Sequence, residues 1–232
     1  MAPSPLAARL FLGGAVPPLA GHIVIRPDVT QSLDNVGRYW TDMNGYVGAF
    51  HGMNTKKLLT SQFALTYDPA AKADEAVSPE SRFQWTATGP GTGRFSFGDA
   101  RAAVFTGFPG PAITIGPVTL ERLDSPFATL IVVPANPSQT IAQADKLLIC
   151  AIGRCDNVGL QWDAQRQTIG SRWGNGAPRI EPVKATLRLA AAGTYTLTSL
   201  DNSGQPKSPD TIVPASAVTL PGNSPWYVIE RR

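Results

Sequence analysis

The residues best suited to chemistry in this sequence are tryptophans that stand among glycines and planar polar side chains. The polar neighbours of Trp162 and Trp173 are Asn157, Gln161, Asp163, Gln165, Arg166, Arg172 and Asn175. Sugars present flat C–H faces on which an exposed aromatic ring can stack, while amide, carboxylate and guanidinium groups bond the hydroxyls. We therefore expect Trp162, Trp173, Gln161 and Asn175 to bind a carbohydrate. The sequence leaves one alternative open, in which the two indole rings cap the fold.

A second group of aromatic residues lies in the stretch 28–60, which is rich in glycine and asparagine and has no regular pattern. This stretch contains Tyr39, Trp40 and Tyr46 beside polar side chains. Long irregular loops are uncommon in compact domains and often carry function. We therefore predict that Tyr39, Trp40 and Tyr46 form a second part of the sugar-binding surface.

Carboxylates are the next candidates, because glycoside hydrolysis needs two of them about 5–10 Å apart across a sugar. The glutamates of the chain are Glu75, Glu80, Glu121, Glu181 and Glu230. None of them stands in an Asn-Glu pair at a strand end, so we assign no catalytic residue. Glu181 shares a block with Arg154, Arg179 and Asn157. We predict a structural network there, in which Glu181 forms a buried ion pair with Arg154 or Arg179 and Asn157 bonds loop backbone.

Other catalytic and ligand-binding patterns are missing from the sequence. His22 and His51 are far apart, and no Gly-x-Ser-x-Gly nucleophile motif accompanies either. The glycine-rich stretch 89–93 contains a proline and lacks the lysine of a phosphate-binding loop. Turns rich in Asp and Asn are compatible with Ca²⁺, but the regular ligand spacing is absent. Cys150 and Cys155 have no Cys/His cluster beside them for zinc, and a disulfide would need a turn between them. We expect no cofactor and no metal.

Composition narrows the classes of protein further. The chain has 20 Lys and Arg residues against 17 Asp and Glu residues, with a formal net charge of +3. The basic residues form no run, so we expect no nucleic-acid partner. No apolar run approaches the ~18 residues of a membrane span, so we expect no membrane insertion. The first ten residues lack the charged start of a signal peptide, so we expect none in this chain.

The sequence predicts that the elements that position these residues are β-strands. Short apolar or alternating runs recur between turn signals, which is typical of a sandwich or barrel. The runs that we expect to be strands are 6–12, 22–25, 58–66, 81–88, 93–97, 102–108, 113–115, 118–123, 127–133, 146–152, 183–189, 194–200 and 226–230. The run 146–152 is apolar at nearly every position, which predicts a central strand buried on both faces.

Little room remains for helix, because the chain contains 22 glycines and 21 prolines. We expect only a helical turn at 69–76 and another at 138–144. The prediction is an all-β chain, folded as one antiparallel, jelly-roll-like β-sandwich domain over residues 1–232. The irregular stretch at about 28–60 is expected to be a loop insertion in this domain.

One block of the sequence resembles a known group of domains. Its residues are Leu147-Leu-Ile-Cys-Ala-Ile-Gly-Arg-Cys-Asp-Asn-Val-Gly-Leu-Gln-Trp162 and Trp173-Gly-Asn-Gly-Ala-Pro-Arg-Ile-Glu-Pro-Val183. They resemble the C-terminal β-sandwich of large bacterial polysaccharide-degrading proteins with a clan A glycoside hydrolase barrel, in which Gly-Arg-x-x-Asn-x-Gly precedes a Trp, a Trp-Gly-x-x-Pro and a Glu-Pro-Val. The similarity extends over residues 1–25 and 60–232. The catalytic barrel, with its acid/base and nucleophile carboxylates, is absent from this chain.

The resemblance implies a non-catalytic accessory module of a secreted or cell-surface enzyme. Its expected partners are the catalytic barrel domain of a parent protein and a polysaccharide such as a β-glucan, a mannan or a xylan. Two alternatives stay open at this point. The domain could be a structural buttress of the barrel without sugar binding, or it could be a glycoside hydrolase with a carboxylate site of its own.

Overall fold

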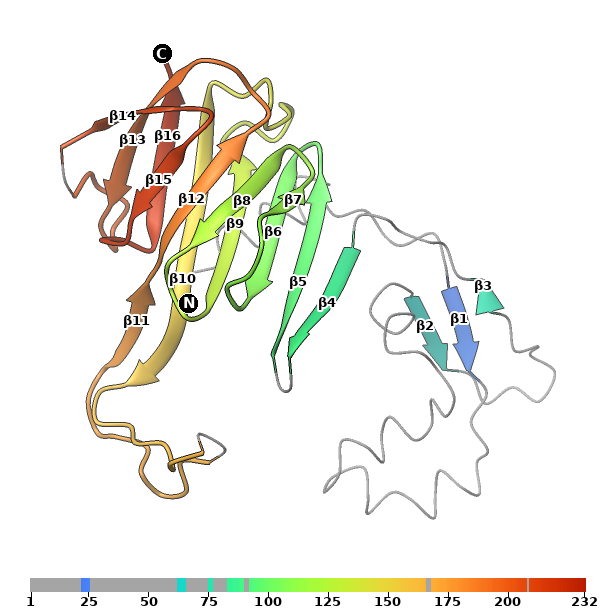
Figure 1. Cartoon of the computed structure of the whole chain (residues 1–232), viewed down its shortest axis with the longest axis vertical. Coiled ribbons are helices and arrows are strands. Elements are labelled where there is room, and N and C mark those ends of the chain that lie inside the picture. Colours follow the sequence, from blue (N-terminus) through green and yellow to red (C-terminus); the bar gives the residue numbers. More distant parts are fainter. Residues whose placement is uncertain are drawn as a thin grey trace. The chain divides into compact units, whose positions relative to one another are not determined.

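Figure 1 shows the chain as a computed structural model, which describes residues 83–89, 92–165, 168–207 and 209–232 and the short strands 22–25, 62–65 and 75–76. The chain divides into two units, one made of residues 1–16 with 82–232 and the other of residues 17–81. All regular elements in the described residues are β-strands. The predicted all-β class is therefore confirmed.

The first unit contains a large antiparallel sheet with the order β14-β13-β16-β10-β9-β6-β5-β4 and with β11 paired to the end of β10. Its strands are β4 (Phe83–Gly89), β5 (Thr92–Asp99), β6 (Ala102–Gly107), β9 (Ala128–Pro134), β10 (Lys146–Asn157), β11 (Pro178–Pro182), β13 (Thr194–Leu200), β14 (Thr211–Pro214) and β16 (Trp226–Arg231). The strands β4, β5, β6, β9 and β10 follow one another as neighbours, apart from the β7–β8 excursion. In this half of the sheet, strands that follow one another in the sequence are therefore also neighbours in space.

A smaller antiparallel sheet completes the sandwich. Its order is β15-β12-β8-β7, with β7 (Ile113–Ile115), β8 (Val118–Leu123), β12 (Lys184–Leu189) and β15 (Val218–Pro221). Leu120 and Leu187 of this sheet share one buried cluster with Leu130, Ile149 and Tyr195 of the large sheet. Two sheets with a common core between their inner faces make a β-sandwich, as the strand pattern predicted.

The strand β10 lies in the centre of the large sheet and is buried on both faces. Leu147 and Ile149 are fully buried in the core between the sheets. Cys150 is fully buried in a second cluster, with Ile131 and Val133. Because successive strand residues point to opposite faces, this second cluster lies on the other face of the large sheet. The prediction for residues 146–152 is confirmed.

The helical turn expected at 138–144 is present only as a single turn and is not a helix. The segment forms turns, in which the Ala144 N–H donates to the Thr140 carbonyl at 2.9 Å. Ile141 and Ala144 are fully buried in the sandwich core, and β10 begins at Lys146. A segment this short cannot propagate a helix, and here it serves to fill the end of the core.

The second unit contains a small three-stranded sheet. Its central strand β1 (His22–Ile25) pairs in parallel with β2 (Gln62–Leu65) and antiparallel with β3 (Glu75–Ala76). Strands expected at 22–25 and within 58–66 are confirmed. The helical turn expected at 69–76 is wrong for its last two residues, because Glu75 and Ala76 form the strand β3, which pairs with β1.

Candidate functional site

The longest strand of the sandwich continues beyond the sheet as a projecting hairpin. β10 pairs with β9 and β16 only as far as Ile152, and its last residues pair with β11 alone. We call residues 153–182 the arm. Figure 1 shows the arm extending from the sandwich as a two-stranded ribbon with an irregular loop. No described residue of the arm is buried, so the arm presents nearly all of its side chains to solvent.

Backbone hydrogen bonds continue along the arm beyond its strands. The Gln161 N–H donates to the Arg172 carbonyl at 3.1 Å, and the Asp163 N–H donates to the Thr168 carbonyl at 2.9 Å. The two halves of the arm therefore stay paired close to its tip. Paired backbone restrains the positions of the side chains that this loop carries.

Glycines allow the two halves of the arm to approach closely near Trp173. Gly174 has a φ of +75°, and a Cβ there would lie 2.5 Å from the Val158 carbonyl oxygen and 2.6 Å from the Leu160 nitrogen. A Cβ on Gly176 would lie 2.4 Å from the Val158 Cβ. No side chain fits at either position. The backbone of the Trp-Gly-x-Gly sequence therefore packs closely against the opposite half of the arm.

The predicted aromatic and amide residues of the 157–175 region all lie in the arm. Trp173 is 61% exposed and Trp162 is 39% exposed, and both are among the most exposed large apolar residues described. Gln161 and Asn175 are exposed as well. The Asn157 Nδ2 donates to the Trp173 carbonyl at 3.2 Å, which is the loop-backbone contact expected of it. These rings do not cap the core, and their binding of a ligand stays a prediction.

The second aromatic group lies outside the described residues. This applies to Tyr39, Trp40 and Tyr46 and to the whole stretch 28–60. Their role, the loop insertion and the single-domain boundary over residues 1–232 stay predictions.

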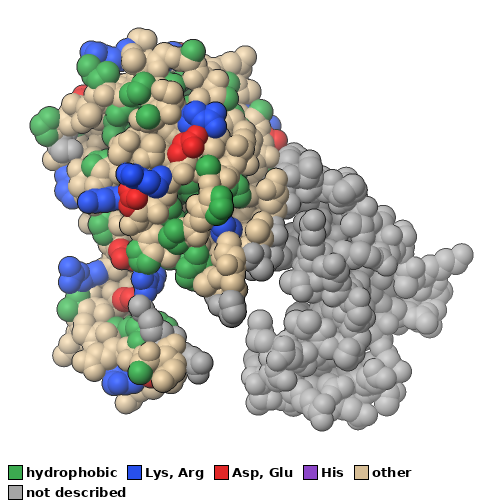
Figure 2. Space-filling view, viewed as in Figure 1, with side chains coloured by type: hydrophobic (Ala, Val, Ile, Leu, Met, Phe, Trp, Pro, Cys, Tyr) green, Lys and Arg blue, Asp and Glu red, His purple; other side chains and the backbone are tan. Residues whose placement is uncertain are grey.

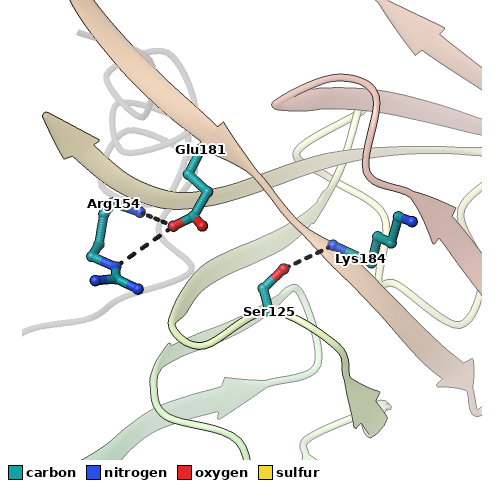
Figure 3. Close-up of polar contacts among 4 residues, drawn as sticks. All are labelled: Ser125, Arg154, Glu181 and Lys184. Atoms are coloured by element: carbon teal, nitrogen blue, oxygen red, sulfur yellow. Dashed lines mark hydrogen bonds and ion pairs between the residues drawn. The ribbon is translucent and has the colours of Figure 1, made fainter. Parts of the chain in front are cut away.

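Glu181 pairs with one of the two arginines proposed for it. The Glu181 Oε2 lies 3.6 Å from the Arg154 Nε and accepts a hydrogen bond from the Arg154 backbone N–H at 3.4 Å; Figure 3 shows both contacts. A Cβ on Gly153 would lie 3.0 Å from this oxygen, so the glycine gives the carboxylate its room. The pair is not buried as predicted, because its side chains are 36% and 41% exposed. Exposed pairs contribute only about 0.2–1 kcal/mol.

A second set of contacts fixes the base of the arm to the sandwich. The Lys184 N–H donates to the Ser125 Oγ at 3.2 Å, and the Asp124 N–H donates to the Lys184 carbonyl at 2.9 Å. Figure 3 shows the first of these contacts beside the Arg154–Glu181 pair. Val183, between β11 and β12, is fully buried. The turn after β8 therefore holds the strand that leads out of the arm.

An open pocket of about 540 Å³ lies at the base of the arm. Its lining residues are Arg154, Asp156, Asn157, Val158, Gly159, Arg179, Ile180, Glu181 and Pro182. Figure 2 shows positive and negative side chains gathered where the arm leaves the sandwich. The volume is in the range of small-ligand sites. The sequence reasoning missed Asp156, because only the β10–β11 register places it opposite Arg179.

The described part of the chain contains no cluster of metal-ligating side chains and two free cysteines. No group of three or more His, Cys, Asp or Glu side chains in these residues could hold a metal ion. Cys150 and Cys155 are both free thiols, the first buried and the second exposed. Burial raises the pKa of Cys150 to about 12. Among the described residues, no helix is both long and apolar enough to span a membrane.

Comparison with known proteins gives no match: no protein-family model, no curated protein and no solved structure is detectably similar to this chain. The geometry of the arm and of its pocket is therefore the main guide to function.

Proposed function

We propose that this chain is a non-catalytic carbohydrate-binding module of a polysaccharide-degrading enzyme, secreted or displayed at the cell surface. In this proposal the arm binds the glycan by aromatic stacking. The observation that carries the proposal is the 61% exposure of Trp173 on a paired hairpin that contributes nothing to the core. A large exposed indole on an element outside the core is typical of a contact surface rather than of a structural one.

The size of the expected effect follows from the area of the ring. Covering about 100 Å² of apolar surface stabilises a complex by about 2.5 kcal/mol. This agrees with the loss of about 2 kcal/mol or more that marks hot-spot residues on truncation. The exposed Gln161 and Asn175 and the polar pocket add hydrogen-bonding groups for the hydroxyls. Stacking and hydrogen bonding are then available on one element.

Affinity electrophoresis against soluble β-glucan, mannan and xylan tests this function. We expect at least one of these polymers to retard the intact chain. Trp173→Ala should weaken the retardation more than tenfold, since about 2 kcal/mol exceeds the 1.4 kcal/mol of one decade. Ile212→Ala is the matched control, because Ile212 is 59% exposed on β14 and lies outside the arm. The control should bind as the intact chain does.

Two results would refute sugar binding by the arm. One is the absence of retardation by any of the three polymers, which would favour the structural buttress. The other is an equal effect of Trp173→Ala and Ile212→Ala, which would show that the arm is not the contact surface. Circular dichroism of both variants shows whether either of them has lost the fold.

One observation favours a second candidate function. Asp156 and Glu181 line the same pocket, and a hydrolase needs two carboxylates across a sugar. Against it, the pocket is open to solvent, and the Glu181 Oε2 is already engaged by Arg154. An open pocket also lacks the water exclusion that strengthens electrostatic catalysis. We therefore rank a glycoside hydrolase below the binding module.

A further inference from the structure

The pocket at the base of the arm contains equal numbers of positive and negative side chains. The positive residues are Arg154 and Arg179, and the negative residues are Asp156 and Glu181. Arg154 and Glu181 form an ion pair with each other, with 3.6 Å between the Arg154 Nε and the Glu181 Oε2. Asp156 and Arg179 are direct partners in the β10–β11 register, and neither forms an ion pair with another side chain in the described part of the chain. The two are thus left as a donor and an acceptor side by side.

We propose that Asp156 and Arg179 bind neighbouring hydroxyl groups of an uncharged sugar, and that the charge balance of the pocket selects neutral glycans. This inference rests on the proposed function and names its substrate class. Directly opposed residues in an antiparallel pair have Cβ atoms about 4.5–5.5 Å apart. An ionised carboxylate only accepts hydrogen bonds and a guanidinium only donates them. A pair of adjacent hydroxyls, one donating and one accepting, satisfies both groups at once.

The same pocket disfavours charged polysaccharides of either sign. The carboxylate of a polyuronate would meet Asp156 and Glu181, and the ammonium of a cationic glycan would meet Arg154 and Arg179. Like charges brought together in a binding site act against the wrong ligand. A neutral glycan meets neither penalty. The arrangement therefore discriminates between glycans by their charge.

The pocket lies beside the backbone of Trp173, the residue with the exposed ring. Asn157 lines the pocket and donates to the carbonyl of Trp173 at 3.2 Å. Gly159, another lining residue, lies against Gly174, the residue after Trp173. A glycan that enters the pocket can therefore continue along the arm towards the indole.

A charge-matched pair of variants tests the inference. Asp156→Asn and Glu121→Gln each raise the net charge by one, but Glu121 lies on β8 and is paired with Arg188 at 2.6 Å. We measure affinity electrophoresis in the neutral polymer that retards the intact chain and in polygalacturonate. Asp156→Asn should weaken binding of the neutral polymer about tenfold, as expected for a lost hydrogen bond to a charged group, and should gain retardation in polygalacturonate. Glu121→Gln should change neither.

A second variant keeps the test independent of folding effects at Asp156. Arg179→Gln should also weaken binding of the neutral polymer, but it should gain no affinity for polygalacturonate, because it removes a positive charge. Equal retardation of the intact chain by polygalacturonate and by the neutral polymer would overturn the inference. So would equal effects of Asp156→Asn and Glu121→Gln. In both cases a selective loss in Trp173→Ala would leave the proposed function intact, whereas no retardation by any glycan would remove both.

Discussion

At the scale of single residues, Glu181 illustrates how exposure changes the meaning of an ion pair. The sequence predicts a buried pair, whose disruption from one side costs about 3–5 kcal/mol. The structure places both side chains at the surface, 36% and 41% exposed. Solvent screens such a pair, and its two flexible side chains lose entropy on pairing. The contact orients the base of the arm more than it stabilises the fold.

Glu181→Ala should therefore be a mild substitution. We expect the free energy of unfolding to fall by about 0.2–1 kcal/mol, measured by urea denaturation. Glu121→Ala is the control, because Glu121 pairs with Arg188 with a similarly exposed side chain. The two variants should differ little. A melting temperature lowered by more than about 8 °C would contradict the exposed-pair interpretation, since 1 kcal/mol shifts a domain of this size by about 2–4 °C.

The two cysteines should react very differently. The pKa of the buried Cys150 thiol is raised to about 12, and only the thiolate is nucleophilic. At pH 8 we expect the native chain to give one fast thiol equivalent with Ellman's reagent, from the exposed Cys155. Denaturant should release the second. Two fast equivalents in the native state, or none in a Cys155→Ser variant after unfolding, would contradict this assignment.

The raised pKa also links Cys150 to stability at alkaline pH. The folded pKa of about 12 lies above the ordinary thiol pKa of 9.0, so the contribution of Cys150 to stability is fully present below pH 9 and is lost as the pH rises towards 12. Each pH unit in this window should cost up to about 1.4 kcal/mol. Chemical denaturation of the intact chain and of Cys150→Ala at pH 8 and pH 10.5 measures the difference. The same pH dependence in both proteins would exclude Cys150 as its source.

At the scale of elements, the arm lies outside the core of the sandwich. Its described residues are absent from the buried core, whereas the flanking Ala151 and Val183 are fully buried. The pairing of β10 with β11 is irregular between Ile152 and Cys155 and regular beyond Cys155, with Asp156 opposite Arg179. The core therefore ends where the arm begins, and the loop of the arm is positioned by its own backbone pairing and glycines.

Replacing residues 157–178 by Asn-Gly should leave the sandwich folded. A two-residue Asn-Gly turn matches the twist of antiparallel strands that are in direct register. We expect the melting temperature to change by only a few degrees, because no core contact is removed, and glycan retardation to be lost. Ile149→Ala is the contrasting variant, since truncation of this fully buried residue should cost about 2–5 kcal/mol. A loss of fold in the shortened protein would show that the arm is structural.

At the scale of the whole molecule, the described part of the first unit combines a closely packed sandwich with the projecting arm. The two sheets share a core in which Tyr195, Ile149 and Leu187 are nearly inaccessible to solvent. Binding sites work best when a rigid scaffold positions the loops that carry them. A packed sandwich that carries an exposed arm is compatible with the proposed binding module, in which the arm contacts an extended polymer.

The intact chain should release no reducing sugar from β-glucan, mannan or xylan. The reason is chemical: the carboxylates that share a pocket, Asp156 and Glu181, lie in an open site, where Glu181 is occupied by Arg154. The measurement compares the intact chain with Glu181→Gln and Asp156→Asn. Activity in the intact chain that either substitution removes would establish the hydrolase instead.

Much of the sandwich follows from local patterns. The apolar run 146–152 predicted a strand buried on both faces, and β10 is that strand. The same reasoning missed β11, β14 and β15, which are short and end in proline, a residue depleted from strands. It also predicted a helical turn at 138–144, where the structure has turns with one helix-like hydrogen bond, from the Ala144 N–H to the Thr140 carbonyl.

The sequence by itself determined the all-β class, the central strand and the segment that carries Trp162 and Trp173. Alternation and turn residues act over a few positions, and they are readable without knowledge of the rest of the chain. Tertiary structure alone decided that these tryptophans are exposed on an arm, that Glu181 contacts Arg154 rather than Arg179, and that Asp156 stands opposite Arg179. Each of these depends on the pairing of β10 with β11, whose residues meet across a loop of some twenty positions. Register and exposure are properties of that long-range pairing, and the local pattern of either strand does not contain them.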